Sequence, residues 1–271
     1  MMEQSQESSG HRVALVTGAT GAIGKGIARQ IAEKHAYEVV LLCRDEEKAK
    51  KAVEEIKKST ANNKVRYELV DVSSLASIRN LSKRWQGRLD ALVNNAAVTP
   101  QKREETAEGI ELQFATNVMG YFWMVDQFIP FLTESPSPRV VNVASYWAGG
   151  LDLNDLEFKN RPYNNDMAYR QSKQANRMLT VASAERLKSQ NISVNACHPG
   201  DVDSTLSNNL GFAGSDSPAV GAKTPVWLAT DPIGNGGSGQ YFEHMQKTQC
   251  RFGENHKEVE ALYEICDSLY R

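Results

Sequence analysis

The order of apolar and helical segments constrains the fold of this chain more than any other feature. Longer segments with helical spacing, such as the one in which Ile23, Ile27 and Ile31 recur every four residues, separate short apolar runs. Strands that alternate with helices in this way form a parallel sheet covered on both faces. We therefore predict one doubly wound α/β domain with about seven strands. The predicted strands are residues 13–17, 38–43, 65–72, 89–97, 139–145, 192–200 and 239–243.

Helices are expected between these strands, at the carboxyl ends of which doubly wound proteins bind their ligands. Asp45 is a candidate cap for a helix at residues 45–59, and a long helix ends near Leu132. Another helix begins near Asp166 after a loop of about twenty residues. The remaining predicted helices are residues 21–35, 73–85, 219–230 and 254–269.

The composition is that of an ordinary soluble globular protein. Of the 271 residues, 41% are apolar and 24% are charged, and the formal net charge is −2. This charge gives no reason to expect nucleic acid or an anionic membrane as a partner. The four cysteines lack metal-ligand spacing, which favours reduced thiols and a cytoplasmic location.

Two segments of the sequence could serve for targeting or membrane insertion. The first ten residues, MMEQSQESSG, lack a basic and an apolar region, so we expect a disordered tail at 1–10 and one domain at 11–271. Residues 112–132 are long enough to span a membrane, but Asn117, Asp126 and Pro130 argue for a buried helix and no integral membrane segment. The aromatic residues of this helix exceed what one core face needs, which suggests a homodimer.

A glycine-rich turn, TGATGAIG, follows the first predicted strand and opens a helix. In that context, backbone N–H groups can hold a pyrophosphate. Read as TGxxxGxG, the motif lacks its middle glycine; read as TGxxGxxG, every glycine fits. The two spacings belong to different kinds of enzyme, so the turn alone leaves the chemistry open. The candidate cofactor-binding residues are Gly18, Thr20, Gly21, Ala22, Ile23 and Gly24.

The residue after the second predicted strand indicates which dinucleotide fits. An acidic residue there would bind the ribose 2′-hydroxyl of NAD, whereas an arginine would accept the 2′-phosphate of NADP. Arg44 occupies this position, and Lys25 is a candidate second cation. Asp45 favours NAD unless it caps the next helix. The pattern favours NADP(H), bound in part by Arg44.

Small and polar residues end two further predicted strands. Asp71 and Val72 end the third strand, where they could contact the adenine. Asn95 and Ala96 lie in the sequence NNAA at the end of the fourth, where small residues leave room for a cofactor. Each of these could also be an ordinary strand-end residue.

Tyr169 and Lys173 have the clearest chemistry. At a spacing of four residues on a helix, the phenol and the ammonium share one face. A nearby cation favours the phenolate, which would lower the pKa of Tyr169 and make it a general acid or base. Ser145 ends the fifth strand and could donate a hydrogen bond to a carbonyl oxygen. Asn117, in a buried helix, is either a structural or a catalytic amide.

Together these residues resemble the short-chain dehydrogenase/reductase family over nearly the whole chain. The long separation of Ser145 from Tyr169, the sequence CRD and the sequence SGQYF are similar to its retinol dehydrogenase-like branch, which usually uses NADP. The chain departs from the family at Ala22, Ala97 and Ala144, none of which removes a reacting group. The family's motifs correspond here to Gly18–Gly24, Asn94–Ala97, Asn117, Ser145, Tyr169, Lys173 and Pro199–Gly200.

The resemblance implies a Rossmann-type domain that interconverts an alcohol and an aldehyde or ketone by hydride transfer with NADP(H). Tyr169 would protonate the carbonyl oxygen, and Lys173 would lower its pKa and hold the ribose hydroxyls. Ser145 would orient the substrate oxygen, and Asn117 would keep a water in a proton relay. The cofactor would also contact Tyr169, Lys173, Pro199, Gly200 and Val202.

Two other functions remain open. The TGxxGxxG spacing is that of the family's epimerase and dehydratase branch, whose chains are longer because they add a substrate domain. A cofactor-binding regulator without turnover is the second alternative, but it would not need Ser145, Tyr169 and Lys173.

The loops beside the catalytic residues indicate the substrate class. Their apolar residues either anchor two long loops or line a largely apolar pocket, into which Arg161 and Arg170 could intrude. We expect a small apolar aldehyde, ketone or alcohol as substrate. The apolar residues are Trp147, Phe158, Tyr163, Leu206, Leu210 and Phe212.

Overall fold

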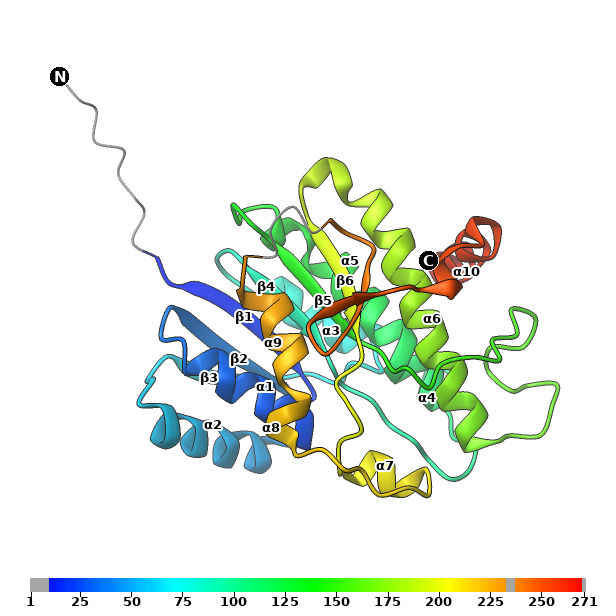
Figure 1. Ribbon diagram of the computed structural model, residues 1–271, viewed down its shortest axis with the longest axis horizontal. Helices are drawn as coiled ribbons and strands as arrows, with labels where there is room; N and C mark the ends of the chain where they lie inside the picture. The colour runs from blue at the N-terminus through cyan, green and yellow to red at the C-terminus, as the bar shows by residue number, and fades with distance from the viewer. Residues whose placement is uncertain (1–9, 233–236, 270–271) are drawn as a thin grey trace.

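Seven strands of the sheet are parallel and follow the doubly wound order in the computed structural model, which describes residues 10–232 and 237–269 (Figure 1). The order is β3-β2-β1-β4-β5-β6-β7-β8. The predicted tail lies outside the described residues except for Gly10. The strands are β1 (Arg12–Thr17), β2 (Tyr37–Cys43), β3 (Val65–Leu69), β4 (Ala91–Asn94), β5 (Arg139–Val143), β6 (Ser193–Cys197), β7 (Tyr241–Glu243) and β8 (Gln246–Thr248).

The eighth strand, β8, is the one that the apolar pattern does not predict. It pairs antiparallel with β7 through a two-residue turn in which His244 and Met245 have φ of 50° and 60°. Two positive φ values are typical of a type I′ hairpin turn. The sequence of β8, QKT, is polar and half exposed at the sheet edge, so it carries no apolar signal.

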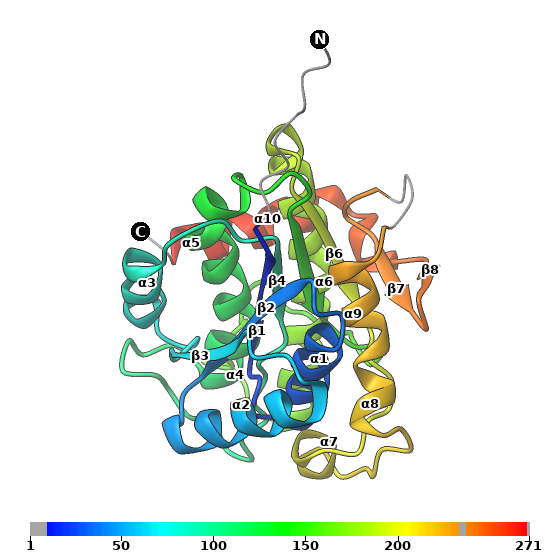
Figure 2. The ribbon, with the colours of Figure 1, turned by 90° about the vertical axis from the view of Figure 1, so that its left-hand side faces the viewer.

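Helices cover both faces of the sheet, as predicted (Figure 2). On one face, α3 (Leu75–Arg84), α5 (Gly120–Leu132) and α6 (Asn165–Arg186) pack on Leu15 and its neighbours, with α10 (His256–Ser268) joining the same core. On the other face, α1 (Ala22–Ala32), α2 (Glu46–Thr60) and α9 (Lys223–Thr230) pack on Val16 and its neighbours. Successive strand residues point to opposite faces, so adjacent residues of β1 belong to different cores.

Local capping and breaks explain where the helices begin and end. The Asp45 carboxylate accepts from the Lys48 backbone N–H at 3.0 Å, so it caps α2 as expected. The segment expected as one helix at residues 219–230 divides at Ala222 into α8 (Pro218–Gly221) and α9. The chain also contains the unpredicted α7 (Thr205–Asn209), and 3₁₀ turns at Lys188–Gln190 and Arg251–Gly253.

The segment at residues 112–132 is buried but is not one regular helix. It consists of α4 (Leu112–Phe114), a π-helical turn (Ala115–Met119) and α5. Most of its aromatic residues are covered by the chain itself, since Trp123 is 1% exposed and the Phe122 ring lies 5.2 Å from that of Tyr263 on α10, while Phe131 is partly buried. Most of the aromatic surface that suggested a homodimer is therefore used inside the protein, and the homodimer stays a prediction. Within the described residues, every helix is too short or too polar to cross a membrane.

The order of the strands places a binding site beside β1. From β1 the chain builds outward to β2 and β3, and then returns to β4 on the other side of β1. Doubly wound sheets bind ligands at such a reversal, outside the carboxyl ends of the strands.

Candidate active site

A pocket of about 340 Å³ lies at this reversal. The ends of β1 to β4 and the start of α1 line it, together with Ser204, Thr205 and Leu206 from the cap and first turn of α7. The candidate residues of the glycine-rich turn and of the next three strand ends all contribute to this lining. They are Gly18, Thr20, Gly21, Ala22, Ile23, Gly24, Arg44, Asp71, Val72, Asn95 and Ala96.

The three glycines of the turn differ in whether the backbone at that position has room for a side chain. Gly18 has a φ of +64°, and a Cβ there would lie 2.8 Å from the Ala96 Cα. A Cβ at Gly24 would lie 2.3 Å from the Gly18 carbonyl oxygen. At Gly21, in contrast, the backbone is extended and the nearest atom would be 3.3 Å away. Gly18 and Gly24 are therefore required by the geometry, whereas a Cβ at Gly21 would make one tight contact, which favours the TGxxxGxG reading with Ala22 at the middle position.

Asn95 holds the glycine-rich turn in place. Its Nδ2 donates to the Thr17 carbonyl at 2.9 Å, and its backbone N–H donates to Thr17 Oγ1 at 2.8 Å. The Ala96 N–H donates to the same hydroxyl at 3.0 Å. The ends of β1 and β4 are thus tied together, which fixes the wall of the pocket.

Two cations line the pocket near the end of β2, and one of them differs from the prediction. Arg44 is exposed there, as expected. The second cation is Lys48, four residues further along, which pairs with the Asp45 carboxylate at 3.3 Å, whereas Lys25 lies outside the lining and pairs with Glu55 at 2.9 Å.

A second, smaller pocket adjoins the first and contains the catalytic candidates. Ile23, Ser204 and Leu206 line both pockets, so the two are continuous. The smaller pocket is also lined by Ser145, Tyr169, Pro199, Gly200 and Val202 from the prediction, and by Tyr146, His198 and Asp201, which sequence reasoning missed.

Tyr169 and Lys173 lie one turn apart on α6, and both are buried, with exposures of 8% and 2%. Lys173 Nζ donates to the Val143 carbonyl at 2.9 Å and lies 5.6 Å from the Tyr169 ring centroid. Burial raises the pKa of Tyr169 to about 12, against a hydrogen bond from Ser145 that lowers it. Burial also lowers the pKa of Lys173 to about 7. In this geometry burial of the phenol dominates and the pKa of Tyr169 lies above its ordinary value, so the lowering effect expected of Lys173 stays a prediction.

Arg177 continues the same row of α6 by one more turn. Its Nη1 donates to the Ser145 carbonyl at 3.5 Å, while its guanidinium lies 3.5 Å from the Tyr241 ring centroid and its Nε contacts Cys250 Sγ. Lys173 and Arg177 of α6 therefore contact the carbonyl groups of Val143 and Ser145, two residues apart in the same segment. The Ser145 hydroxyl accepts from the Trp147 N–H at 3.0 Å and donates its own proton to the Tyr169 phenol oxygen.

The Asn117 side chain is occupied by protein partners. Its Oδ1 accepts from the Val98 N–H at 2.9 Å, and its Nδ2 lies 3.1 Å from the Val98 carbonyl and 3.3 Å from Ser172 Oγ. These contacts support the structural interpretation of the amide. The residue itself lies in the π-helical turn, and such turns occur frequently at functional sites.

The predicted substrate-pocket residues separate into two groups. Trp147 and Phe212 contact each other, with ring centroids 5.0 Å apart, and line the smaller pocket with Leu206. Phe158 and Tyr163 pack on each other at 5.4 Å away from it, so they anchor their loop instead. Leu210 does not line this pocket.

Neither predicted intruding arginine reaches the pocket lining in the described part of the chain. Arg161 donates to the Gln171 side chain at 2.7 Å and lies over the Phe158 ring. Arg170 lies beside Gly149, because one of its guanidinium nitrogens would be 3.5 Å from a Cβ placed on that glycine.

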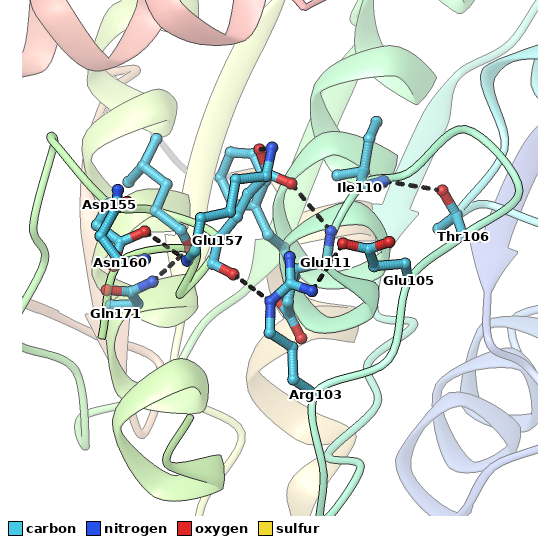
Figure 3. A network of polar contacts seen from close by, with 12 residues as sticks. Arg103, Glu105, Thr106, Ile110, Glu111, Asp155, Glu157, Asn160 and Gln171 are labelled. Atoms are coloured by element: carbon cyan, nitrogen blue, oxygen red, sulfur yellow. Dashed lines mark hydrogen bonds and ion pairs between the residues drawn. The ribbon is translucent and has the colours of Figure 1, made fainter. Parts of the chain in front are cut away.

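The two loops flanking the site are held by a polar network (Figure 3). Arg103 donates to the Glu157 carbonyl at 2.9 Å and to the Glu105 carboxylate at 2.7 Å. The Glu111 N–H donates to the Glu157 carboxylate at 3.1 Å. These bonds join the loop after β4 to the long loop before α6, which explains how a loop with little regular structure holds Trp147 near Tyr169.

Comparison with known proteins agrees with this fold and site. The sequence profile of the short chain dehydrogenase family matches residues 12–212. The chain is 33% identical over 256 residues to retinol dehydrogenase 13 of Mus musculus, covering 87% of this chain and 76% of that protein. It is 32% identical over 264 residues to a probable oxidoreductase of Streptomyces antibioticus, covering 90% and 88%. The chain belongs to the short-chain dehydrogenase family, in its retinol dehydrogenase-like branch, and is an oxidoreductase.

Solved structures show the same architecture. An uncharacterised protein from Mycobacterium paratuberculosis is similar with a TM-score of 0.80 and 26% identity, covering 95% of this chain and 92% of that one. The NADP complex of RhlG from Pseudomonas aeruginosa is similar with a TM-score of 0.66 and 25% identity, covering 85% and 93%.

Proposed function

We propose that this protein is an NADP(H)-dependent oxidoreductase that interconverts an apolar alcohol and its aldehyde or ketone. One observation carries the proposal. A pocket with a glycine cradle and two cations is continuous with a second pocket that contains Tyr169 and Ser145.

The residues of the larger pocket fit an NADP(H) molecule. At Gly18 and Gly24 a side chain would fill the space in which a pyrophosphate can approach the backbone. Arg44 and Lys48 suit the 2′-phosphate, because Asp45, the nearest carboxylate in sequence, is engaged as a helix cap. When bound, the cofactor supplies or accepts the hydride. An NADP complex of a relative at 25% identity supports the same choice.

The protein's own groups supply the proton chemistry. Burial raises the pKa of Tyr169 to about 12, so the phenol is protonated at neutral pH and holds the proton that the oxygen of a carbonyl substrate would receive. The Ser145 hydroxyl, which hydrogen-bonds to Tyr169, orients that oxygen when a substrate lies between the two groups, and Lys173 holds the chain beneath it at Val143. Asn117 could contribute a relay water only through its main chain, since its side-chain amide is engaged.

The substrate is apolar because the catalytic pocket is walled by Trp147, Phe212 and Leu206. We also propose a cytoplasmic location, supported by four free cysteines of which Cys43, Cys197 and Cys266 are buried.

The test is NADPH oxidation with a panel of carbonyl compounds, including straight-chain aldehydes of increasing length. Each buried methylene contributes up to about 0.8 kcal/mol, so kcat/KM should rise along the series until the pocket is full. A preference for a sugar nucleotide would favour the epimerase alternative. NADPH binding without turnover of any compound would favour the regulator.

A further inference from the structure

A third cavity, of about 330 Å³, adjoins the smaller, catalytic pocket and forms its mouth. Tyr146, Trp147, Asp201 and Phe212 line both spaces, while Ala213 and Ser215 line the outer one alone. A substrate whose carbonyl reaches Tyr169 would therefore extend outward between three aromatic rings. We call the outer space the aromatic mouth.

Asp201 is the one charged residue among the described residues that line either the catalytic pocket or the aromatic mouth. Its side chain is 48% exposed, and within the described chain no lysine or arginine forms an ion pair with it. The nearest basic group is His198, whose Nε2 lies 3.9 Å from an Asp201 carboxylate oxygen. Burial lowers the pKa of His198 to about 4, so the imidazole does not neutralise the carboxylate near pH 7.

The backbone holds Asp201 at this position. Its N–H donates to the Asp216 carboxylate at 3.2 Å, and its carbonyl accepts from the Asp216 N–H at 2.9 Å. The preceding Gly200 has a φ of +106°, a conformation that side-chain-bearing residues rarely adopt. The carboxylate is thus presented by a fixed turn rather than by a free loop.

The aromatic rings of the mouth are also fixed. The Tyr146 ring packs edge-on against His198 with centroids 4.7 Å apart, although 52% of the residue is exposed. Burial and the nearby Asp201 carboxylate, which accepts a hydrogen bond from the phenol, both raise the pKa of Tyr146. Trp147 packs against Phe212 on the other side. Ring faces carry negative electrostatic potential, and a carboxylate among them adds a full charge.

We propose that the preferred substrate carries an ammonium group, which binds in the aromatic mouth between Asp201 and the rings while its carbonyl group lies at Tyr169. This inference rests on the proposed function and amends its substrate class: the part of the substrate beside Trp147, Phe212 and Leu206 is apolar, and the part that extends into the aromatic mouth carries the charge. A cation is attracted both by the Asp201 carboxylate and by the faces of the aromatic rings. A neutral hydrocarbon would cover the carboxylate without supplying an opposite charge, and an anion would be repelled.

The experiment compares two aldehydes of the same shape. One is 4-(trimethylammoniomethyl)benzaldehyde, and the other is 4-neopentylbenzaldehyde, in which carbon replaces nitrogen. We expect kcat/KM to favour the cation by about tenfold or more. In Asp201→Asn that ratio should fall toward one. Any intrinsic difference in reactivity between the aldehydes is the same for both enzymes, so the change in the ratio isolates the carboxylate.

Asp203→Asn is the matched control, because Asp203 is exposed two residues away and lies outside both linings. It should keep the wild-type ratio. NADPH binding and the thermal midpoint of each variant show that it is folded. Equal use of the two aldehydes by the wild type, an unchanged ratio in Asp201→Asn, or a preference for 4-(carboxymethyl)benzaldehyde would overturn the inference while leaving the oxidoreductase intact. Turnover of no aldehyde at all would overturn both.

Discussion

Arg44 lies where a residue can select between the two nicotinamide cofactors, and Lys48 adds a second positive charge to the same wall. Replacing Arg44 with alanine should weaken NADPH binding by about 1.5–3 kcal/mol, because a charge-assisted hydrogen bond to phosphate is lost. NADH, which has no 2′-phosphate, should be little affected. Titration of both cofactors by fluorescence checks this, with Lys25→Ala as the control that should leave both affinities unchanged. Equal wild-type affinities for NADPH and NADH would contradict the assignment.

Lys173 gives the protein a pH-dependent stability of known sign. Its pKa is lowered to about 7 in the folded protein from 10.5, so the unfolded chain binds more protons between these values. The free energy of unfolding should therefore rise with pH from about 7 toward 10, by at most about 1.4 kcal/mol per pH unit from this group. Urea unfolding of the wild type and Lys173→Met at pH 7, 8 and 9 isolates the effect from the buried tyrosines and cysteines. Parallel stability curves for the two proteins would show that Lys173 does not titrate in this window.

At the scale of elements, α6 acts as a support for Ser145 as well as the carrier of Tyr169. Loss of the Arg177 guanidinium would release the Ser145 carbonyl, and small displacements of a catalytic group can lower the rate steeply. Arg177→Met should therefore lower kcat about tenfold or more with little change in NADPH affinity, and Arg177→Lys should recover part of it.

Arg186 is the matched control on the same helix. Its guanidinium lies 3.6 Å from the Tyr263 ring centroid, much as that of Arg177 lies over Tyr241, but it does not contact Ser145. Arg186→Met should lower the thermal midpoint and leave kcat unchanged. If both variants lose activity in proportion to stability, Arg177 has a structural role only.

Most elements could be predicted because burial imposes its pattern on them. The central residues of β1, Ala14, Leu15 and Val16, are fully buried, so they must be apolar. The elements that were missed lack this constraint. β8 is a polar edge strand set by a turn, and the break between α8 and α9 lies between Gly221 and Pro225, two helix-breaking residues that the spacing of the apolar residues does not take into account.

Prediction from the sequence has the same limit at the candidate site, where only residues with a local signal could be found. Motif residues such as Tyr169 and Gly18 carry local signals, and the structure brings them to two connected pockets. Tyr146 and Asp201 meet only because β5 and β6 are neighbours in the sheet, and no sequence spacing encodes that contact. The sequence alone could not show which role Phe158 has, since an aromatic residue in a loop can either anchor that loop or line a pocket.

At the scale of the whole molecule, α10 closes one face of the protein. Leu262 of this helix is fully buried in the core beneath it, whereas Leu269, just past its end, is 40% exposed. Leu262→Ala should lower the free energy of unfolding by about 2–5 kcal/mol, and Leu269→Ala by far less. Urea titration measures both. Similar small losses would mean that α10 contributes little to the core.

The central claim is that hydride passes between NADP(H) and a carbonyl carbon while Tyr169 supplies the proton. The most direct measurement uses NADPH carrying deuterium at both C4 positions, with 4-neopentylbenzaldehyde as acceptor and mass spectrometry of the alcohol product. We expect one deuterium on the carbinol carbon with the wild-type protein. With Tyr169→Phe the rate should fall by about 10²–10⁴ while NADPH still binds. Alcohol without deuterium, or Tyr169→Phe turnover within a few-fold of the wild type, would contradict the claim.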